Sequence, residues 1–169
     1  MDALEQVIAR DEIRQLAYRY ALAMDSRNID DLVGLFVEDV QVGAHATGRE
    51  ALRENFERQL REVGVTILFV GNHVIDFDQE DAAHGQVYCR AEVEEGDRWI
   101  QQAILYTDRY RRQDGRWYFV RRQHRLWYGA EKATNPLRQD PAHWPASQTG
   151  RGSLPGEWET WTNFWGKTK

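Results

Sequence analysis

Two side chains in this sequence could together form an oriented general base. His73 lies within the apolar stretch 67–77, and Asp25 follows a helical pattern near the start of the chain. A neutral imidazole accepts a proton near neutral pH because its unperturbed pKa is about 6.5. A carboxylate bonded to the other ring nitrogen fixes the tautomer and stabilises the imidazolium. His73 and Asp25 are therefore candidate catalytic residues, although His73 also suits a satisfied core position and Asp25 a turn that ends a helix.

Two further groups could assist such a base. Tyr20 precedes Asp25 by about one helical turn, so its hydroxyl could donate to a carbonyl oxygen or a leaving group. Packing in the core is the other interpretation of Tyr20. Arg125, on the last predicted strand, could hold a carbonyl oxygen or a negative charge. Strand parity separates Arg125 from His124, and the sequence leaves open which of the two faces inward, because a bulge would exchange them.

The stretch around His73 also predicts an apolar ligand. Read with the strand period of two, its odd-numbered residues share one face, which is apolar except for His73. Side chains of this kind around a cavity bind hydrophobic small molecules. The predicted substrate-binding residues are Ile67, Phe69 and Ile75 on this strand and Tyr88 on the next.

Helical patterns dominate the first part of the chain, where apolar residues recur at helical spacing. Asp2 suits the N-cap of the first helix, and Thr47 with Glu50 has the spacing of a capping box for the third. Residues 40–44 predict a short strand. The predicted helices span about 4–24, 29–36 and 47–63.

From Val65 the pattern changes to the strand period of two. Short, turn-rich connections separate the apolar runs, and Asp114-Gly115 is a strong hairpin signal. Long strands joined by tight turns indicate an antiparallel meander. The predicted fold class is α+β, with three N-terminal helices packed on a strongly curved antiparallel sheet to form a cone-shaped α+β barrel with an internal cavity. The predicted strands span about 65–77, 82–94, 98–112 and 115–128.

The chain after Gly129 has a different character. It contains all 4 prolines of the sequence, together with several glycines, which exclude long regular elements. Trp158, Trp161 and Trp165 lie at i, i+3 and i+7, which predicts a short helix with one aromatic face. We therefore divide the chain into an α+β barrel region at 1–128 and a Pro/Trp-rich C-terminal extension at 129–169. The extension is expected to pack on the barrel or on a neighbouring subunit.

The composition excludes several classes of function. A chain of 169 residues suits one domain with a substantial core, and a formal charge of −5 with a pI near 5.6 argues against a nucleic-acid binder. Cys89 is the only cysteine, so an intrachain disulfide and a cysteine-based metal cluster are excluded. We find no metal-ligand spacing of histidines and no glycine-rich phosphate loop, so no metal and no cofactor are expected. The arginines from Arg109 to Arg122 are expected on a solvated or inter-subunit face.

The start of the chain shows no basic region followed by an apolar run, and no stretch approaches the length of a membrane span. The expected location is therefore the cytoplasm, with no membrane partner.

Several short motifs resemble those of the SnoaL-like family within the nuclear transport factor 2-like superfamily. The resemblance covers about residues 5–128 and is closest to the branch that holds scytalone dehydratase, bile-acid 7α-dehydratase and hexachlorocyclohexane dehydrochlorinase. The motifs are IRQLAYRY at 13–20, AMD at 23–25, LVGLF at 32–36, VGNH at 70–73, YTDRY at 106–110 and DGRW at 114–117.

The resemblance implies an Asp–His dyad, with the aspartate just beyond the first helix and the histidine on a following strand. Asp25 and His73 are the matching positions. Bile-acid dehydratase relatives add a tyrosine on the first helix and an arginine on the last strand, for which Tyr20 and Arg125 are the counterparts. The second histidine of scytalone dehydratase has no matching position, which leaves the substrate of that enzyme in doubt for this chain.

Residues and resemblance together predict a cofactor-independent lyase that acts on a hydrophobic cyclic small molecule by dehydratase-like elimination. Two alternatives stay open: a double-bond isomerase or cyclase in the same cavity, and a non-catalytic ligand-binding or assembly module such as a dioxygenase small subunit. We also expect a homo-oligomer, with a trimer favoured over a dimer, because a curved sheet leaves a convex face to cover.

Overall fold

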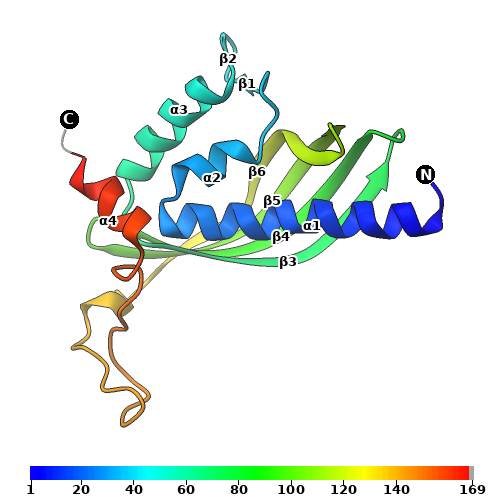
Figure 1. Ribbon diagram of the computed structural model, residues 1–169. Coiled ribbons are helices and arrows are strands. Elements are labelled where there is room, and N and C mark those ends of the chain that lie inside the picture. Colours follow the sequence, from blue (N-terminus) through cyan, green and yellow to red (C-terminus); the bar gives the residue numbers. More distant parts are fainter. Residues whose placement is uncertain (168–169) are drawn as a thin grey trace.

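Three helices pack on one side of a curved antiparallel sheet in the computed structural model, which describes residues 1–167 (Figure 1). The sheet has the strand order β3-β4-β5-β6, and each strand runs antiparallel to the next. The predicted α+β architecture is therefore confirmed. The helices are α1 (Ala3–Ser26), α2 (Ile29–Gly34) and α3 (Arg49–Arg61). The strands of the sheet are β3 (Thr66–Phe77), β4 (Ala82–Glu95), β5 (Arg98–Gln113) and β6 (Arg116–Lys132).

The predicted N-cap is present at the start of α1 and absent at the start of α3. Asp2 caps α1 in a capping box with Glu5, as the sequence indicates. At α3 the N-cap is Gly48, with φ at 97° and no side-chain hydrogen bond, so the capping box predicted for Thr47 and Glu50 is wrong. Thr47 instead lies in a small ladder of β1 (Gln41–Val42) and β2 (Ala46–Thr47), which leaves it outside the cap.

A β-bulge in β3 exchanges the two faces of that strand. The pairing with β4 shifts by one residue between Val70 and His73. Before the bulge the even-numbered side chains face the helices, so Leu68 packs against the core while Phe69 is 62% exposed. After the bulge the odd-numbered side chains face the helices, and Ile75 is buried. The single inward parity predicted for 65–77 is therefore wrong for the first half of the strand.

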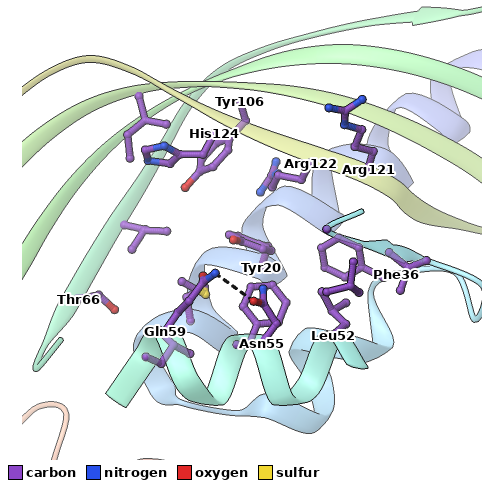
Figure 2. Close-up of a pocket in the computed structure, with 18 of the residues that line it drawn as sticks. Tyr20, Phe36, Leu52, Asn55, Gln59, Thr66, Tyr106, Arg121, Arg122 and His124 are labelled. Carbon is purple, nitrogen blue, oxygen red and sulfur yellow. Dashed lines mark hydrogen bonds between the residues drawn. The ribbon is translucent and has the colours of Figure 1, made fainter. Parts of the chain in front are cut away.

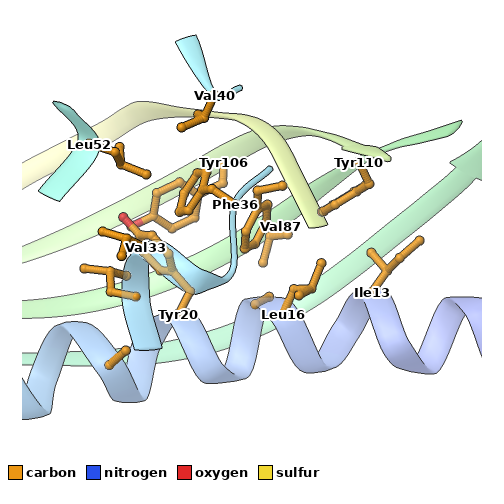
Figure 3. Packing of buried hydrophobic residues seen from close by; sticks show 14 of the residues in the cluster. Ile13, Leu16, Tyr20, Val33, Phe36, Val40, Leu52, Val87, Tyr106 and Tyr110 are labelled. Carbon is orange, nitrogen blue, oxygen red and sulfur yellow. The ribbon is translucent and has the colours of Figure 1, made fainter. Parts of the chain in front are cut away.

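Tyr20 of α1 lies at the centre of an aromatic cluster that ties the helices to the sheet (Figure 3). Its ring makes edge-on contacts at centroid distances of 6.0 to 6.4 Å. Pairs of this geometry add about 0.5–1.5 kcal/mol each beyond the apolar area that they bury. The four partners are Phe36, Phe56, Tyr106 and Phe119.

The C-terminal segment folds back on its own chain. β6 runs to Lys132, beyond the strand end predicted at residue 128, because the antiparallel pairing with β5 continues to that point. Near the end of the chain, Thr160 Oγ1 donates to the Ser26 carbonyl at 2.7 Å, and Arg61 donates to the Phe164 carbonyl at 3.0 Å. The last helix therefore docks beside the end of α1 and on α3 (Figure 1). The elements of this segment are η1 (Pro136–Arg138) and α4 (Glu159–Gly166).

Within the described residues, no helix combines the length and the apolar character that crossing a membrane requires.

Candidate active site

A large cavity opens between the helices and the sheet (Figure 2). Its volume is about 1040 Å³, which is enough for a drug-sized molecule. Helices α1 and α3 form one wall, and strands β3 to β6 form the opposite wall. Much of this surface is apolar, which suits a ligand with a hydrophobic body. The apolar lining includes Phe36, Leu52, Phe56, Leu60, Leu68 and Ile104.

Two tyrosine hydroxyls in this cavity have no protein partner. The side chains of Tyr20 on α1 and Tyr106 on β5 are buried, and neither hydroxyl forms a hydrogen bond within residues 1–167. Burial raises the pKa of Tyr20 to about 12 and holds the pKa of Tyr106 well above its ordinary value of 10. Both hydroxyls therefore stay protonated near neutral pH and can donate to an oxygen of a ligand.

Arg122 is a buried cation between these two tyrosines. Its Nε and Nη2 donate to the two oxygens of Asp108 at 2.9 and 2.7 Å. The guanidinium carbon lies 4.5 Å from the ring centroid of Tyr20 and 4.3 Å from that of Tyr106. Burial by itself would lower the pKa of Arg122, but the attraction of Asp108 outweighs it and raises the pKa above its ordinary value. The guanidinium is therefore charged, and the solvated face predicted for Arg122 is wrong.

His124 is the candidate base at the mouth of the cavity. It follows Arg122 by two residues on β6, so both side chains lie on the cavity side of the strand (Figure 2). Its ring centroid lies 5.6 Å from that of Tyr106 in an edge-on arrangement. Neither ring nitrogen has a hydrogen-bond partner in the part of the chain that the structure describes. Partial burial lowers the pKa of His124 below 6.5, so the imidazole is neutral at pH 7 and free to accept a proton.

A bulge decides which face of the last strand points inward, a question the sequence leaves open. The pairing between β5 and β6 skips one residue at Val120. Beyond the bulge, even-numbered residues such as Arg122 and His124 line the cavity. Arg125 is exposed and does not line the cavity, so the structure does not bring it to the site. Arg125 was predicted from the sequence as the cation of the site, and in the structure Arg122 occupies that role.

Asp25 lies behind the cavity wall. Its Oδ1 accepts from Thr66 Oγ1 and its Oδ2 from the Leu68 backbone nitrogen, each at 3.0 Å. Burial raises the pKa of Asp25 to about 6, an effect that these two hydrogen bonds and the charge of Arg27 partly offset. The β3 residues in contact with Asp25 are thus Thr66 and Leu68, and both line the cavity.

His73 belongs to a buried hydrogen-bond chain that ends at Arg122. Its Nε2 lies 3.0 Å from the Tyr110 hydroxyl, which donates to Asp108 at 2.8 Å. Because the Tyr110 proton is directed at Asp108, Nε2 must carry the proton of the neutral imidazole. Nδ1 is then a bare acceptor, and it is buried without a partner among the described residues. Gly85 permits this contact, since a Cβ there would lie 3.3 Å from His73 Nε2 and 3.3 Å from the Tyr110 ring.

The predicted contact between His73 and Asp25 is therefore not formed. Asp25 bonds Thr66 and the Leu68 backbone, whereas His73 bonds Tyr110. Five residues of strand separate Leu68 from His73, a rise of about 16 Å at the usual strand spacing. The β3 bulge also lies between them, so the face that meets Asp25 is not continued by His73.

None of the four predicted ligand contacts lines the cavity, and the reversed parity of the first half of β3 accounts for Ile67 and Phe69. Phe69 and Tyr88 are 62% and 46% exposed, and Ile75 is buried in the core below the cavity. Ile67 alternates with the cavity-lining Leu68 and is likewise absent from the wall. The side chains that do line this part of the cavity come from the even-numbered residues of the first half of β3.

Three residues of the site were not among the predicted site residues: Tyr106, Arg122 and His124. One sequence signal could have identified Arg122. Tyr106, Asp108 and Tyr110 alternate along one face of a predicted strand, which places a carboxylate between two aromatic rings. A carboxylate buried in such a place requires a cation, and arginine on the neighbouring strand is its usual partner.

The buried His73 makes a testable contribution to the pH dependence of folding. Burial lowers the pKa of His73 to about 4, whereas the unfolded chain keeps a value near 6.5. Between these values the unfolded state binds more protons, so the free energy of unfolding falls as the pH falls from 6.5 towards 4. His73→Gln removes this term, and its urea midpoint should decline less than that of the unsubstituted protein between pH 7 and pH 5. Equal declines would contradict a buried neutral His73.

The arrangement as a whole suits proton transfer beside a polarised carbonyl. A neutral imidazole can accept a proton while a tyrosine hydroxyl and a guanidinium stabilise the charge that develops on oxygen. No group of three or more His, Cys, Asp or Glu side chains within residues 1–167 is placed to hold a metal ion.

Comparison with known proteins identifies the fold. The model of the SnoaL-like domain family matches residues 5–123. A hexachlorocyclohexane dehydrochlorinase of type 2 is 22% identical, with a TM-score of 0.71 over 78% of this chain and 94% of that one. The type 3 enzyme from Novosphingobium barchaimii LL02 is 22% identical, with a TM-score of 0.70 over 78% and 95% of the two chains. A scytalone dehydratase-like protein from Novosphingobium aromaticivorans DSM 12444 is 24% identical, with a TM-score of 0.69 over 79% and 94%. No curated protein matches the chain.

Proposed function

The chain belongs to the SnoaL-like domain family, and we propose that it is a cofactor-independent lyase acting on a hydrophobic cyclic small molecule. In this proposal His124 removes a proton from the carbon next to a ring carbonyl. Tyr106 donates to the carbonyl oxygen as negative charge grows on it, and the Arg122 cation stabilises that charge. Loss of a hydroxide or halide from the next carbon completes the elimination.

The observation that carries this proposal is the set of polar groups in the cavity without protein partners. The hydroxyls of Tyr20 and Tyr106 and both ring nitrogens of His124 form no hydrogen bond in the described chain, although all three residues line one cavity. These groups face the cavity, where a bound molecule can reach them. A bound molecule with a carbonyl oxygen and an acidic C–H would satisfy both kinds of group at once. The relatives named as a dehydrochlorinase and a scytalone dehydratase add support for elimination as the reaction class.

The proposal is tested with cyclic β-hydroxy ketones, whose dehydration gives a conjugated enone that absorbs in the ultraviolet. The unsubstituted protein should form the enone, and Tyr106→Phe should lower kcat by about 10²–10³-fold, the usual effect of removing one donor to a developing oxyanion. Val74→Thr, at an exposed position outside the cavity wall, is the matched control and should leave kcat unchanged. Equal rates for Tyr106→Phe and the control would contradict the assigned role.

A second candidate function is binding without catalysis, and the surroundings of Asp25 favour it. The two β3 residues that bond Asp25 are Thr66 and Leu68, so this carboxylate has no imidazole to orient. A protein that binds cyclic ketones in the cavity yet neither eliminates a leaving group nor shifts a double bond would support this second function. Double-bond isomerisation would begin with the same proton removal by His124 and return the proton to another carbon.

We also propose that the convex face of the sheet joins copies of the chain. Phe69, Tyr88 and Trp127 are 62%, 46% and 64% exposed there, and the rings of Tyr88 and Trp127 stack at 6.4 Å. Exposed aromatic area of this kind usually marks an interface. Light scattering on the eluting protein should find an oligomer, with a trimer favoured, and Trp127→Glu should convert it to a monomer. A monomeric unsubstituted protein would contradict this proposal.

A further inference from the structure

The cavity differs in charge from the rest of the protein. The chain has 27 acidic residues against 22 lysines and arginines, so an average surface would carry more carboxylates than cations. The residues that line the cavity nevertheless include no aspartate or glutamate among the described part of the chain. The arginines and the histidine of the lining are Arg109, Arg121, Arg122 and His124. This distribution favours a ligand that carries negative charge.

Arg122, the buried cation of this lining, has hydrogen-bond donors that Asp108 does not use. Arg122 uses Nε and Nη2 on Asp108, and Nη1 has no hydrogen-bond partner within residues 1–167. The rings of Tyr20, Tyr106 and Phe119 surround the guanidinium carbon at 4.3 to 4.5 Å, so the free edge is held in one orientation. The side chain of Arg122 is only 4% exposed, and water therefore solvates this charge poorly.

Tyr20, whose ring centroid lies 4.5 Å from the guanidinium carbon, supplies a donor as well. Tyr20 presents an unpartnered hydroxyl whose raised pKa keeps it protonated. A neutral carbonyl oxygen accepts about two hydrogen bonds, whereas a carboxylate accepts about four and also brings the charge that Arg122 attracts. The combination of Nη1 and the Tyr20 hydroxyl therefore matches a carboxylate better than a ketone or an alcohol.

We propose that the ligand of this cavity is a cyclic carboxylic acid in its ionised form, bound through Arg122 Nη1 and the Tyr20 hydroxyl. Its ring lies against the apolar side chains of α3, which include Leu52, Phe56 and Leu60. This inference rests on the proposed function only in using the same cavity. If the elimination takes place, the substrate is a keto acid, with its ketone at Tyr106 beside His124 and its carboxylate at Arg122.

The test compares two probes of the same shape, naphthalene-2-carboxylate and naphthalene-2-carboxamide, by titration calorimetry on the full chain. The carboxylate should bind at least about tenfold more tightly, equivalent to 1.4 kcal/mol. Tyr20→Phe should weaken the carboxylate and leave the amide unchanged. Asp108→Asn should have the opposite effect, because it removes the negative charge that partly neutralises Arg122. It should increase the affinity for the carboxylate and leave the affinity for the amide unchanged. Arg125→Gln, an exposed arginine on β6 that does not line the cavity, is the control and should change either affinity less than twofold.

Equal affinity for the two probes, or no binding of the carboxylate, would overturn the inference. If Asp108→Asn does not fold, the Tyr20→Phe comparison still decides. A preference for the carboxylate without turnover of any β-hydroxy ketone would refute the proposed reaction and keep this inference. Turnover of neutral ketones without a preference for the carboxylate would refute this inference and keep the proposed reaction.

Discussion

Replacing His124 with glutamine is expected to lower kcat for enone formation by about 10²–10⁴-fold, the usual contribution of a positioned general base. Glutamine keeps the size and the polarity of the side chain but cannot accept a proton at working pH. The ring nitrogens of His124 have no protein partner in the described chain, so the substitution breaks no hydrogen bond of the fold and should leave the free energy of unfolding nearly unchanged. Steady-state kinetics at pH 7, with circular dichroism as the check on folding, measure both quantities.

His73→Gln is the matched control for this prediction. His73 bonds Tyr110 and does not line the cavity, so its loss should change kcat by no more than a few fold once the stability of the variant is taken into account. The reverse pattern, with His73→Gln inactive and His124→Gln active, would contradict the assignment of the base. It would favour a reaction centred on the hydrogen-bond chain behind the cavity wall.

Asp108→Ala is expected to have the largest effect on stability of any single substitution considered, about 3–5 kcal/mol lost from the free energy of unfolding. Asp108 is fully buried and accepts from both Arg122 and Tyr110. Its removal leaves the Arg122 cation buried without a counter-ion and the Tyr110 hydroxyl without an acceptor. Urea unfolding at pH 7 measures the loss as a lower midpoint with an unchanged slope.

The double substitution Asp108→Ala with Arg122→Met shows whether the loss comes from the uncompensated charge. Methionine keeps most of the side-chain volume without the charge, so the double variant should regain a large part of the stability that Asp108→Ala loses. Additive losses in the two single variants and the double variant would contradict the explanation by charge.

The sequence predicts the architecture of this chain because each element repeats its own period. The change from helical spacing to strand spacing at Val65 separates the helices from the sheet, and the turn at Asp114-Gly115 joins β5 to β6 as expected. Errors occur where one residue interrupts the period. The bulge between Val70 and His73 in β3 and the bulge at Val120 in β6 each exchange the inward and outward faces. Gly71 lies within the first, and a glycine inside a strand pattern often marks a bulge, whereas the residues around Val120 carry no such signal.

The site was predictable only in part for the same physical reason. Tyr20 was identified correctly as facing the interior because it lies before any bulge, on a continuous helix. His73 was placed by parity and by resemblance, and it does face the interior, but it lies beyond the β3 bulge and bonds Tyr110 instead of Asp25. Arg125 was placed by resemblance alone, because the sequence leaves open which face of the last strand points inward, and it is exposed. The positions of Asp25 and His73 in the sequence match the expected dyad, but Asp25 bonds Thr66 and the Leu68 backbone instead of His73. Matching positions in the sequence therefore did not imply a contact in the structure.

The central claim is that His124 removes a proton from a carbon next to a carbonyl inside this cavity. Exchange of that proton for deuterium measures the step directly, because it needs no leaving group and is followed by proton NMR on a cyclic ketone in D₂O. The unsubstituted protein should accelerate exchange at this carbon over the buffer rate, and His124→Gln should lose at least about 10²-fold of the acceleration. Exchange at the same rate in both proteins, or no acceleration by either, would contradict the account.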